Sequence, residues 1–328
     1  MSRKLLQNRI AESGLTLPVA AIYAVGVWLF SGVLTNGWWV QLICMALAVY
    51  VLVEVNNSNA LIRIRSRMVG SMFLLLSCMD SGLFASVEGG LTCLFVAIAF
   101  WILFQTYQQP DTPGRIYYGF LCLGLASLTF VQILYFVPLA WLLIHTQLQS
   151  MSWRSWIASV FGLITPYWLG LLWAFHLQDG SFYLEHFNSL ATFVFPYPYA
   201  SLQVGHIVVF ALTILLLSMG IIHFINKSYE DRIRIRQLYG FFVFWAFACA
   251  LFLALQPQHY DVLMRILFLC VSPFVAHLFT LTHTRATNVL FIVTIVLTIL
   301  VALYNLLSKD LSSLSSGLPL LWNGLLNF

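Results

Sequence analysis

Charged side chains are scarce in this chain. Asp, Glu, Lys and Arg together make up 8% of its 328 residues, whereas 61% of the residues are hydrophobic. A water-soluble domain of this length needs a much larger polar surface to cover its core. The composition therefore excludes a soluble globular protein. It predicts an all-α polytopic membrane protein, because a spanning helix satisfies its own backbone hydrogen bonds.

Short enzyme motifs are also missing. No P-loop, HExxH, GxSxG or dinucleotide-binding glycine pattern occurs, which argues against an ATPase, a zinc protease, a serine hydrolase or a nicotinamide enzyme. The six cysteines stand singly in apolar stretches without a CxxC pair, so we expect core residues instead of disulfides. Histidine spacing matches no zinc pattern. We expect no metal, no cofactor and no nucleic-acid partner.

Apolar runs long enough to cross a bilayer are abundant. A crossing needs about 20 apolar residues for about 30 Å of hydrocarbon. The run 116–148 would form one helix of about 50 Å, so we expect two short segments that turn near Gln132 and Pro138, as two spans or as a re-entrant hairpin. About eleven spans result: 15–34, 38–55, 68–87, 89–107, 116–131, 134–148, 154–176, 203–225, 238–256, 261–281 and 287–306.

Basic residues fall on one face of this arrangement. With eleven crossings, the positive-inside rule predicts a cytoplasmic N-terminus and an external C-terminus in the cell inner membrane. We expect one membrane domain over 1–328, with an outer interfacial loop at 177–202 and an outer interfacial tail at 307–328. The first span is expected to be retained, because no signal-peptide cleavage site follows it. The basic residues are Arg3, Lys4, Arg9, Arg63, Arg65, Arg67, Arg115, Arg154, the Lys227–Arg236 cluster and Arg285.

Two acids near the predicted outer face are candidate catalytic residues. Asp80 lies about two thirds of the way along an apolar segment, and an acid within a membrane span is a functional candidate. The alternative is that the span ends before Asp80, which then caps a polar turn in Asp-Ser-Gly. Glu88 opens the next helix, where an acid faces the positive end of the helix dipole. Its role is therefore structural or catalytic.

A second polar group opens the span at 261–281. Asp261 precedes Arg265 by one helical turn, which favours a stabilising pair and an N-terminal cap. An arginine inside a membrane helix, flanked by His259 and Asp261, also suits a phosphate or pyrophosphate head group. We therefore hold these three residues as candidate substrate-binding residues.

The outer loop at 177–202 is amphipathic. Phe187 falls on one helical face with other apolar residues, and Glu185 falls on the opposite face, which predicts a short interfacial helix. Tyr197 belongs to an aromatic rim that is typical of a membrane interface. Glu185 and Tyr197 would equally suit a lid over a sugar or an isoprenoid, so both are candidate substrate-binding residues.

The same four-residue pattern occurs in two of the basic loops. Ile62-Arg63-Ile64-Arg65 and Ile233-Arg234-Ile235-Arg236 stand 171 residues apart, near half the chain. This spacing is compatible with an internal repeat of the transporter kind. It is equally compatible with two loops that bind anionic membrane lipid.

The region Gly119–Gly170 carries a family resemblance. Gly124–Leu128, the turn Trp153-Arg154-Ser155-Trp156 and the stretch Gly162–Tyr167 resemble an uncharacterised family of polytopic bacterial inner-membrane proteins. More distantly, the same order is similar to the membrane halves of C-type glycosyltransferases. That resemblance implies use of a polyprenyl-phosphate-linked saccharide at the outer face. The first outer loop, 35–38, carries no acid, so Asp80 and Glu88 would have to replace the family's carboxylates.

Three functions remain open. The first is a transferase-like protein that handles a lipid-linked saccharide, with Asp80 or Glu88 as base and Arg265 on the phosphate. The second is a transporter or flippase for such an amphiphile, which needs a polar path between the spans. The third is a noncatalytic membrane subunit of an envelope complex. Protein partners are not indicated by the sequence.

Overall fold

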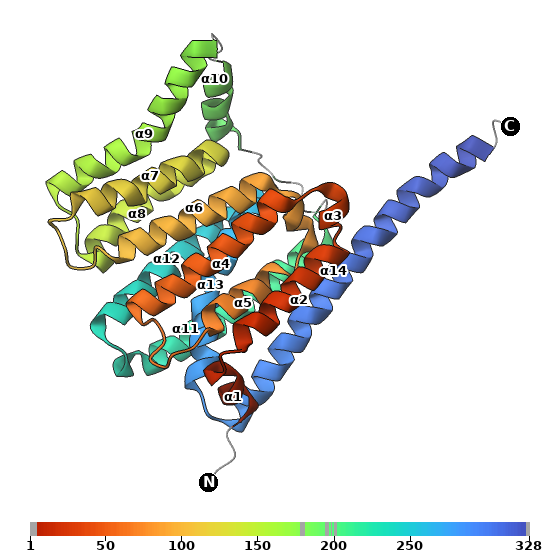
Figure 1. Cartoon of the computed structure of the whole chain (residues 1–328), viewed down its shortest axis with the longest axis horizontal. Coiled ribbons are helices and arrows are strands. Elements are labelled where there is room, and N and C mark those ends of the chain that lie inside the picture. The colour runs from red at the N-terminus through yellow and green to blue at the C-terminus, as the bar shows by residue number, and fades with distance from the viewer. Residues whose placement is uncertain (1–4, 178–180, 194–196, 198, 200–201, 326–328) are drawn as a thin grey trace.

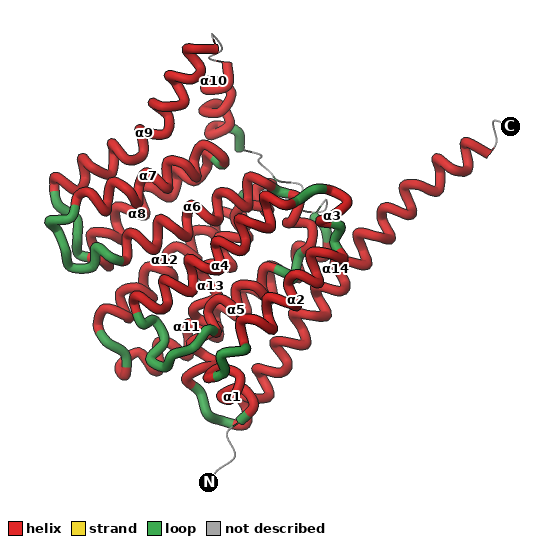
Figure 2. Tube along the Cα trace, in the orientation of Figure 1, coloured by secondary structure: helices red, strands yellow, loops and turns green. Residues whose placement is uncertain are grey.

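The chain folds into a bundle of helices. The computed structural model describes residues 5–177, 181–193, 197, 199 and 202–325, and these contain helices and loops but no strand (Figures 1 and 2). The all-α prediction is confirmed for this part of the chain. The elements are α1 (Leu6–Glu12), α2 (Thr16–Phe30), α3 (Val33–Asn36), α4 (Trp39–Asn59), α5 (Met68–Ser77), η1 (Ser81–Ala85), α6 (Val87–Phe104), α7 (Pro113–Thr129), η2 (Val131–Phe136), α8 (Val137–Leu143), η3 (Ile144–Leu148), α9 (Trp153–Leu177), α10 (Ser181–Asn188), η4 (Ser189–Ala191), α11 (Val204–Lys227), η6 (Ser228–Glu230), α12 (Ile233–Leu255), η7 (Pro257–His259), α13 (Tyr260–Leu281) and α14 (Arg285–Leu325).

Many of these helices suit a membrane. Within the described residues, seven helical segments are long and apolar enough to cross a bilayer, and an eighth results if α1 and α2, bent by 93° at their junction, count as one. Helical residues occupy all eleven predicted ranges. The chain is a multi-pass helical membrane protein by length and composition. The segments are Trp39–Asn59, Val87–Phe104, Val131–Leu148, Val204–Glu230, Ile233–Leu255, Pro257–Leu281 and Arg285–Ser308.

The apolar run 116–148 turns back on itself. Helix α7 ends at Thr129, and Phe130 is extended (φ −140°, ψ 95°) before the chain continues as η2, α8 and η3. The backbone N–H of Gln108, just before α7, donates to the carbonyl of Leu148 at 2.8 Å. The run therefore leaves one end of the bundle and returns to it, which confirms the predicted reversal and excludes a single long helix.

Helix α13 forms the centre of the core. It packs against α5, α6, α11 and α12, and every residue from Val262 to Thr280 is buried (Figure 1). Between Arg265 and His277 its only polar side chain is Ser272, whose hydroxyl bonds to the Leu269 carbonyl. All six cysteines are buried and free, as predicted. The central helix is therefore apolar through its middle and carries arginine and histidine only near its two ends.

Hydrogen bonds between turns define one end, which we call the arginine end. Arg63 pairs with Glu230 at 2.8 Å, and Arg234 donates to Asn59 Oδ1 at 2.7 Å. The two loops with the repeated Ile-Arg-Ile-Arg pattern are thus bonded to each other's flanking residues. Arg63 of the first bonds to Glu230 beside the second, and Arg234 of the second bonds to Asn59 beside the first. Most basic residues of the described chain gather here, and the exceptions are Arg265 of α13 and Lys309 of α14. Those in or beside the turns at this end are Arg9, Arg63, Arg65, Arg67, Arg115, Arg154, Lys227, Arg232, Arg234, Arg236 and Arg285.

The opposite end, which we call the Asp80 end, is held by a separate set of bonds. Asn305 of α14 donates to the Met79 carbonyl at 2.8 Å, and Gln132 donates to the Ser189 carbonyl at 3.4 Å. Part of the predicted loop at 177–202 lies here as α10 and η4, and the rest of it falls outside the described residues. The predicted tail at 307–328 continues α14 to Leu325, and this helix projects beyond the bundle in Figure 1.

A buried carboxylate organises the arginine end. The Asp231 side chain is fully buried and lies 2.9 Å from Arg63 Nε and 3.2 Å from His277 Nε2. It therefore links the α4–α5 loop, the α11–α12 turn and the core helix α13. A buried acid is tolerated only with such partners, because desolvation opposes its charge.

Replacing Asp231 should weaken the whole bundle. Asp231→Asn removes the negative charge that pairs with Arg63 and His277. We expect the free energy of unfolding to fall by about 3 kcal/mol. This value is at the low end for a broken buried ion pair, because Arg63 is partly exposed to water. Thermal unfolding in detergent micelles measures the loss. Glu230→Gln is the matched control, since this exposed acid pairs with the same Arg63, and it should change stability little. Equal destabilisation by both variants would contradict the assignment.

Candidate functional site

Asp80 lies where a helix breaks. Helix α5 ends at Ser77, and Asp80 is extended and caps η1, with its Oδ1 accepting a hydrogen bond from the Gly82 N–H at 2.8 Å. The predicted capping role is thereby confirmed. The residue is nevertheless only 3% exposed, and Oδ2 has no hydrogen-bond partner within the described chain. A capping acid alone does not need such burial, so Oδ2 is available for a second role.

His206 lies beside that oxygen. Its Nε2 lies 3.5 Å from Asp80 Oδ2, and its side chain is 25% exposed. The ring stacks on Tyr260, with centroids 4.1 Å apart and an interplanar angle of 16°. The stack fixes the ring plane, and the carboxylate lies at one ring nitrogen. A buried acid behind a partly exposed histidine is an arrangement suited to general acid–base chemistry.

A first cavity of about 560 Å³ opens beside this pair. It is lined by the α5–η1 break, the start of α11, the start of α13 and one face of α14. Gly205 of α11 packs directly on Asn305, so closely that a Cβ at this position would overlap the Asn305 side chain. Asn305 in turn bonds to Met79. These contacts fix three walls of the cavity relative to Asp80.

A second cavity of about 350 Å³ lies on the other side of α13. Glu88, which is exposed in the first turn of α6, lines it together with His259 and Gln132. His259 lies between two aromatic rings, Phe130 at 5.3 Å and Phe252 at 5.8 Å between centroids. The lining is predominantly polar. This cavity therefore suits a hydrophilic group rather than an acyl chain.

The segment 181–193 covers the second cavity. His186 and Ser189 line it, and His186 Nε2 lies 2.9 Å from the Ser127 carbonyl. Burial lowers the pKa of His186, and the bond to Ser127 partly offsets that effect. The imidazole is thus neutral at pH 7 and donates from Nε2, because a carbonyl only accepts. This segment therefore forms one wall of the second cavity.

Asp261 lines both cavities. It stands in the first turn of α13 with an exposed side chain. The predicted ion pair with Arg265 is not formed, since no contact within 4 Å joins the two groups among the described residues. Three acids therefore line the two cavities. Asp80 lines the first cavity, Glu88 lines the second, and Asp261 lines both.

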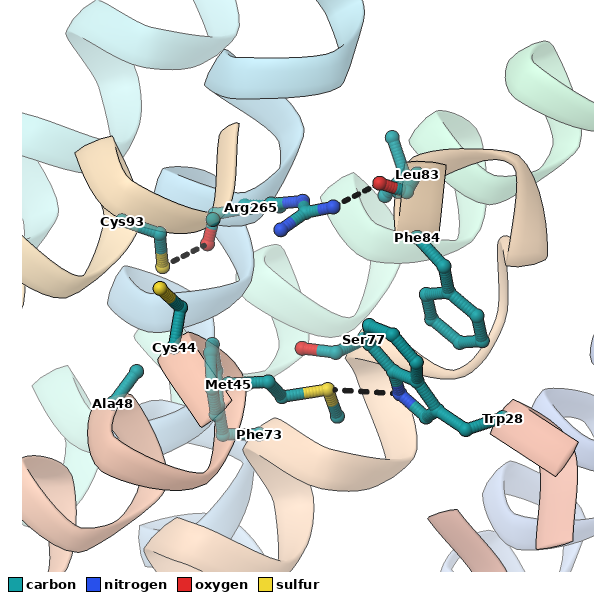
Figure 3. A pocket seen from close by; sticks show the side chains of 11 residues that line it. Trp28, Cys44, Met45, Ala48, Phe73, Ser77, Leu83, Phe84, Cys93 and Arg265 are labelled. Carbon is teal, nitrogen blue, oxygen red and sulfur yellow. Dashed lines mark hydrogen bonds between the residues drawn. The ribbon is translucent and has the colours of Figure 1, made fainter. Parts of the chain in front are cut away.

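Arg265 lies behind these three acids and lines neither cavity. It is 8% exposed, and its guanidinium donates to the Leu83 carbonyl of η1 (Figure 3). It fits there because Gly89 and Gly90 carry no side chains, and a Cβ on either would lie 3.2 Å from a guanidinium nitrogen. A small void of about 20 Å³ adjoins it, next to Ser77 and Trp28. In this arrangement, Arg265 supports η1 and does not face the cavities.

Glu185 and Tyr197 also lie away from the cavities. Glu185 is exposed on α10, and Tyr197 packs against Tyr199 with ring centroids 5.5 Å apart. Neither lines a described cavity. The structure therefore brings together Asp80, Glu88, His259 and Asp261, with Arg265 beneath them. No group of three His, Cys, Asp or Glu that could hold a metal ion occurs in the described part of the chain.

The close approach of Gly205 to Asn305 gives a direct test of the cavity wall. Gly205→Ala should push α14 from α11, break the Asn305–Met79 bond and lower the unfolding temperature in micelles. Gly26→Ala is the matched control, because a Cβ there meets nothing within 4 Å. It should be neutral or stabilising, since alanine favours a helix over glycine by roughly 0.5–1 kcal/mol. Equal tolerance of both substitutions would refute the contact.

Known proteins offer no guide to this site. No protein-family model, no curated protein and no solved structure matches the chain.

Proposed function

We propose first that the Asp80 end faces the outside of the inner membrane. The support is that most basic residues of the described chain lie at the opposite end, which the positive-inside rule assigns to the cytoplasm. Eleven crossings, with α5–η1 and α7 as short spans, give a cytoplasmic N-terminus and an external C-terminus. The cavities then open at the external boundary of the bilayer.

We propose further that the chain handles a lipid-linked saccharide at this boundary. The observation that carries the proposal is the pair of cavities that share Asp261 and are lined by acids on both sides. Carboxylates accept hydrogen bonds from hydroxyl groups, so these three acids suit a saccharide. The same acids repel phosphate. The phosphate and the polyprenyl chain would therefore lie toward the surrounding lipid.

The chemistry of this proposal centres on Asp80 and His206. His206 would take a proton from an attacking hydroxyl, and Asp80 would orient the imidazole and stabilise its protonated form. Tyr260, stacked on the imidazole, keeps the ring in place. Arg265 acts indirectly, by holding the Leu83 carbonyl and with it the turn that carries Asp80. Glu88, His259 and the 181–193 segment would bind the other part of the saccharide.

Transport receives less support than binding or transfer at one face. A flippase needs polar groups through the bilayer, and α13 is apolar between Arg265 and His277 apart from Ser272. Thr213 in the middle of α11 and Thr298 in the middle of α14 are buried, and each hydroxyl bonds to a carbonyl of its own helix. A noncatalytic binding protein with the same cavities remains the main alternative, and turnover distinguishes it from a transferase.

Binding and turnover variants test the proposal together. We expect purified wild-type protein to carry a polyprenyl-phosphate-linked saccharide in native mass spectrometry, and to release polyprenyl phosphate when an acceptor is added. His206→Gln should keep the bound species and lower the release rate by about 10²-fold or more, the usual contribution of a general base. Asp261→Asn should weaken binding itself.

Two exposed residues at the arginine end provide matched controls. His145→Gln and Asp111→Asn make the same chemical changes far from the cavities and should leave both readouts unchanged. A wild-type protein that carries only ordinary phospholipids would reject the substrate class. Retained binding without turnover in the wild type would favour the noncatalytic alternative.

The proposed orientation has its own test. Alkaline phosphatase fused after residue 328 should be active, because it would lie outside, whereas the same reporter fused after Gln108 or after Ser150 should be inactive. Gln108 and Ser150 lie at the same end, since the Thr106 and Ser150 hydroxyls are 3.0 Å apart. Activity at either internal fusion would overturn the proposed orientation.

A further inference from the structure

A large cavity at the arginine end has no role in the proposed function. It measures about 920 Å³ and lies between the α1–α2 junction, the end of α4 and the loop that leads to α5. Arg63, Arg65 and Arg67 line it, and Glu12 is its single acid. Arg63 is held by Glu230 and Asp231. Arg65 and Arg67 are exposed and form no ion pair within the described chain.

An apolar groove continues from this cavity. The groove has a volume of about 340 Å³, and apolar side chains form nearly its whole lining. Leu17, Tyr50 and Val53 line both spaces, so the arginine cavity and the groove adjoin. Trp28 and Met45 line its far end, where the Trp28 indole N–H donates to Met45 Sδ at 3.1 Å.

The groove results from how three helices pack. Helices α2 and α4 both pack on α5 and leave a channel between them, with Leu74 of α5 as part of its floor. Gly70 of α5 allows the two walls to approach, since a Cβ there would lie 2.8 Å from Val53 and 3.3 Å from Leu17. The channel is therefore a fixed feature of the helix packing.

The dimensions match one leaflet of a bilayer. The groove follows α4 from Val53 to Leu42, which is about 16 Å at 1.5 Å per residue. Half of a hydrocarbon core of about 30 Å is about 15 Å. The arginines stand at the head-group level, and the apolar channel extends from there along α4 to Leu42, a length that one acyl chain can fill. An anionic head joined to an acyl chain complements both parts.

We propose that this combined space binds one anionic phospholipid of the leaflet at the arginine end. Its phosphate pairs with Arg65 and Arg67, and one acyl chain occupies the groove between α2 and α4. The site is independent of the saccharide proposal, because it lies at the opposite end and uses none of the same residues. It also gives the arginines of the α4–α5 loop a defined ligand.

Lipid titrations of the full chain in detergent micelles test the site. In native mass spectrometry, phosphatidylglycerol should bind one-to-one and more tightly than phosphatidylcholine with the same acyl chains. The double variant Arg65→Ala/Arg67→Ala should weaken phosphatidylglycerol binding about 30-fold, at about 1 kcal/mol per arginine and tenfold per 1.4 kcal/mol. Both arginines are exposed, so folding should be retained.

Matched variants separate this site from general surface charge. Arg232→Ala/Arg236→Ala removes two exposed arginines from the other arginine loop and should change the affinity less than threefold. Ala46→Phe, which fills the groove, should weaken binding, and Leu47→Phe, exposed outside the groove, should not.

Three results would overturn the proposal. They are equal binding of the two phospholipids, equal weakening by the two double-arginine variants, and displacement of phosphatidylglycerol by a tighter-binding polyprenyl phosphate. The last result would mean that the arginines bind the phosphate of a polyprenyl lipid and not that of a phospholipid.

Discussion

A helix that breaks near the membrane leaves backbone carbonyls that water does not reach, and each needs a donor from elsewhere in the protein. The segment between α5 and α6 meets this constraint with side chains from three other helices. Asn305 of α14 donates to Met79, Arg265 of α13 to Leu83, and Gln41 of α4 to Ala85. The break can therefore persist, and Asp80 is held inside it. The cavities exist because these distant helices must converge on one turn.

The same logic explains why the polar residues separate into two groups. Helix α13 is buried over nearly its whole length, so its charged and titratable groups are tolerated only where other segments supply partners. Arg265 finds a carbonyl at one end, and His277 finds Asp231 at the other. The apolar stretch between them separates the two ends. This core therefore favours a function at one membrane face over transport along a polar path through the bilayer.

Much of the fold was predictable, because apolar run length and basic-residue placement are local features of the sequence. They gave the helical class, the reversal near Gln132 and the gathering of arginines at one end. Asp80 stood out as an acid within an apolar segment and Glu88 as an acid at a helix start. His206 was not recognised as a site residue, because its importance depends on Asp80, 126 residues earlier. Gly205, its neighbour, was the available signal, since a glycine in the first turn of an apolar helix permits close packing.

The two proposed sites are separate, yet they meet at η1. The groove between α2 and α4 ends at Trp28, which stacks on Phe84 with centroids 4.1 Å apart and an interplanar angle of 9°. Phe84 belongs to the same short helix whose Leu83 carbonyl Arg265 holds. An acyl chain that reaches Trp28 would press on the element that positions Asp80. The stack of Trp28 on Phe84 thus joins the helices that form the groove to the turn that holds Asp80.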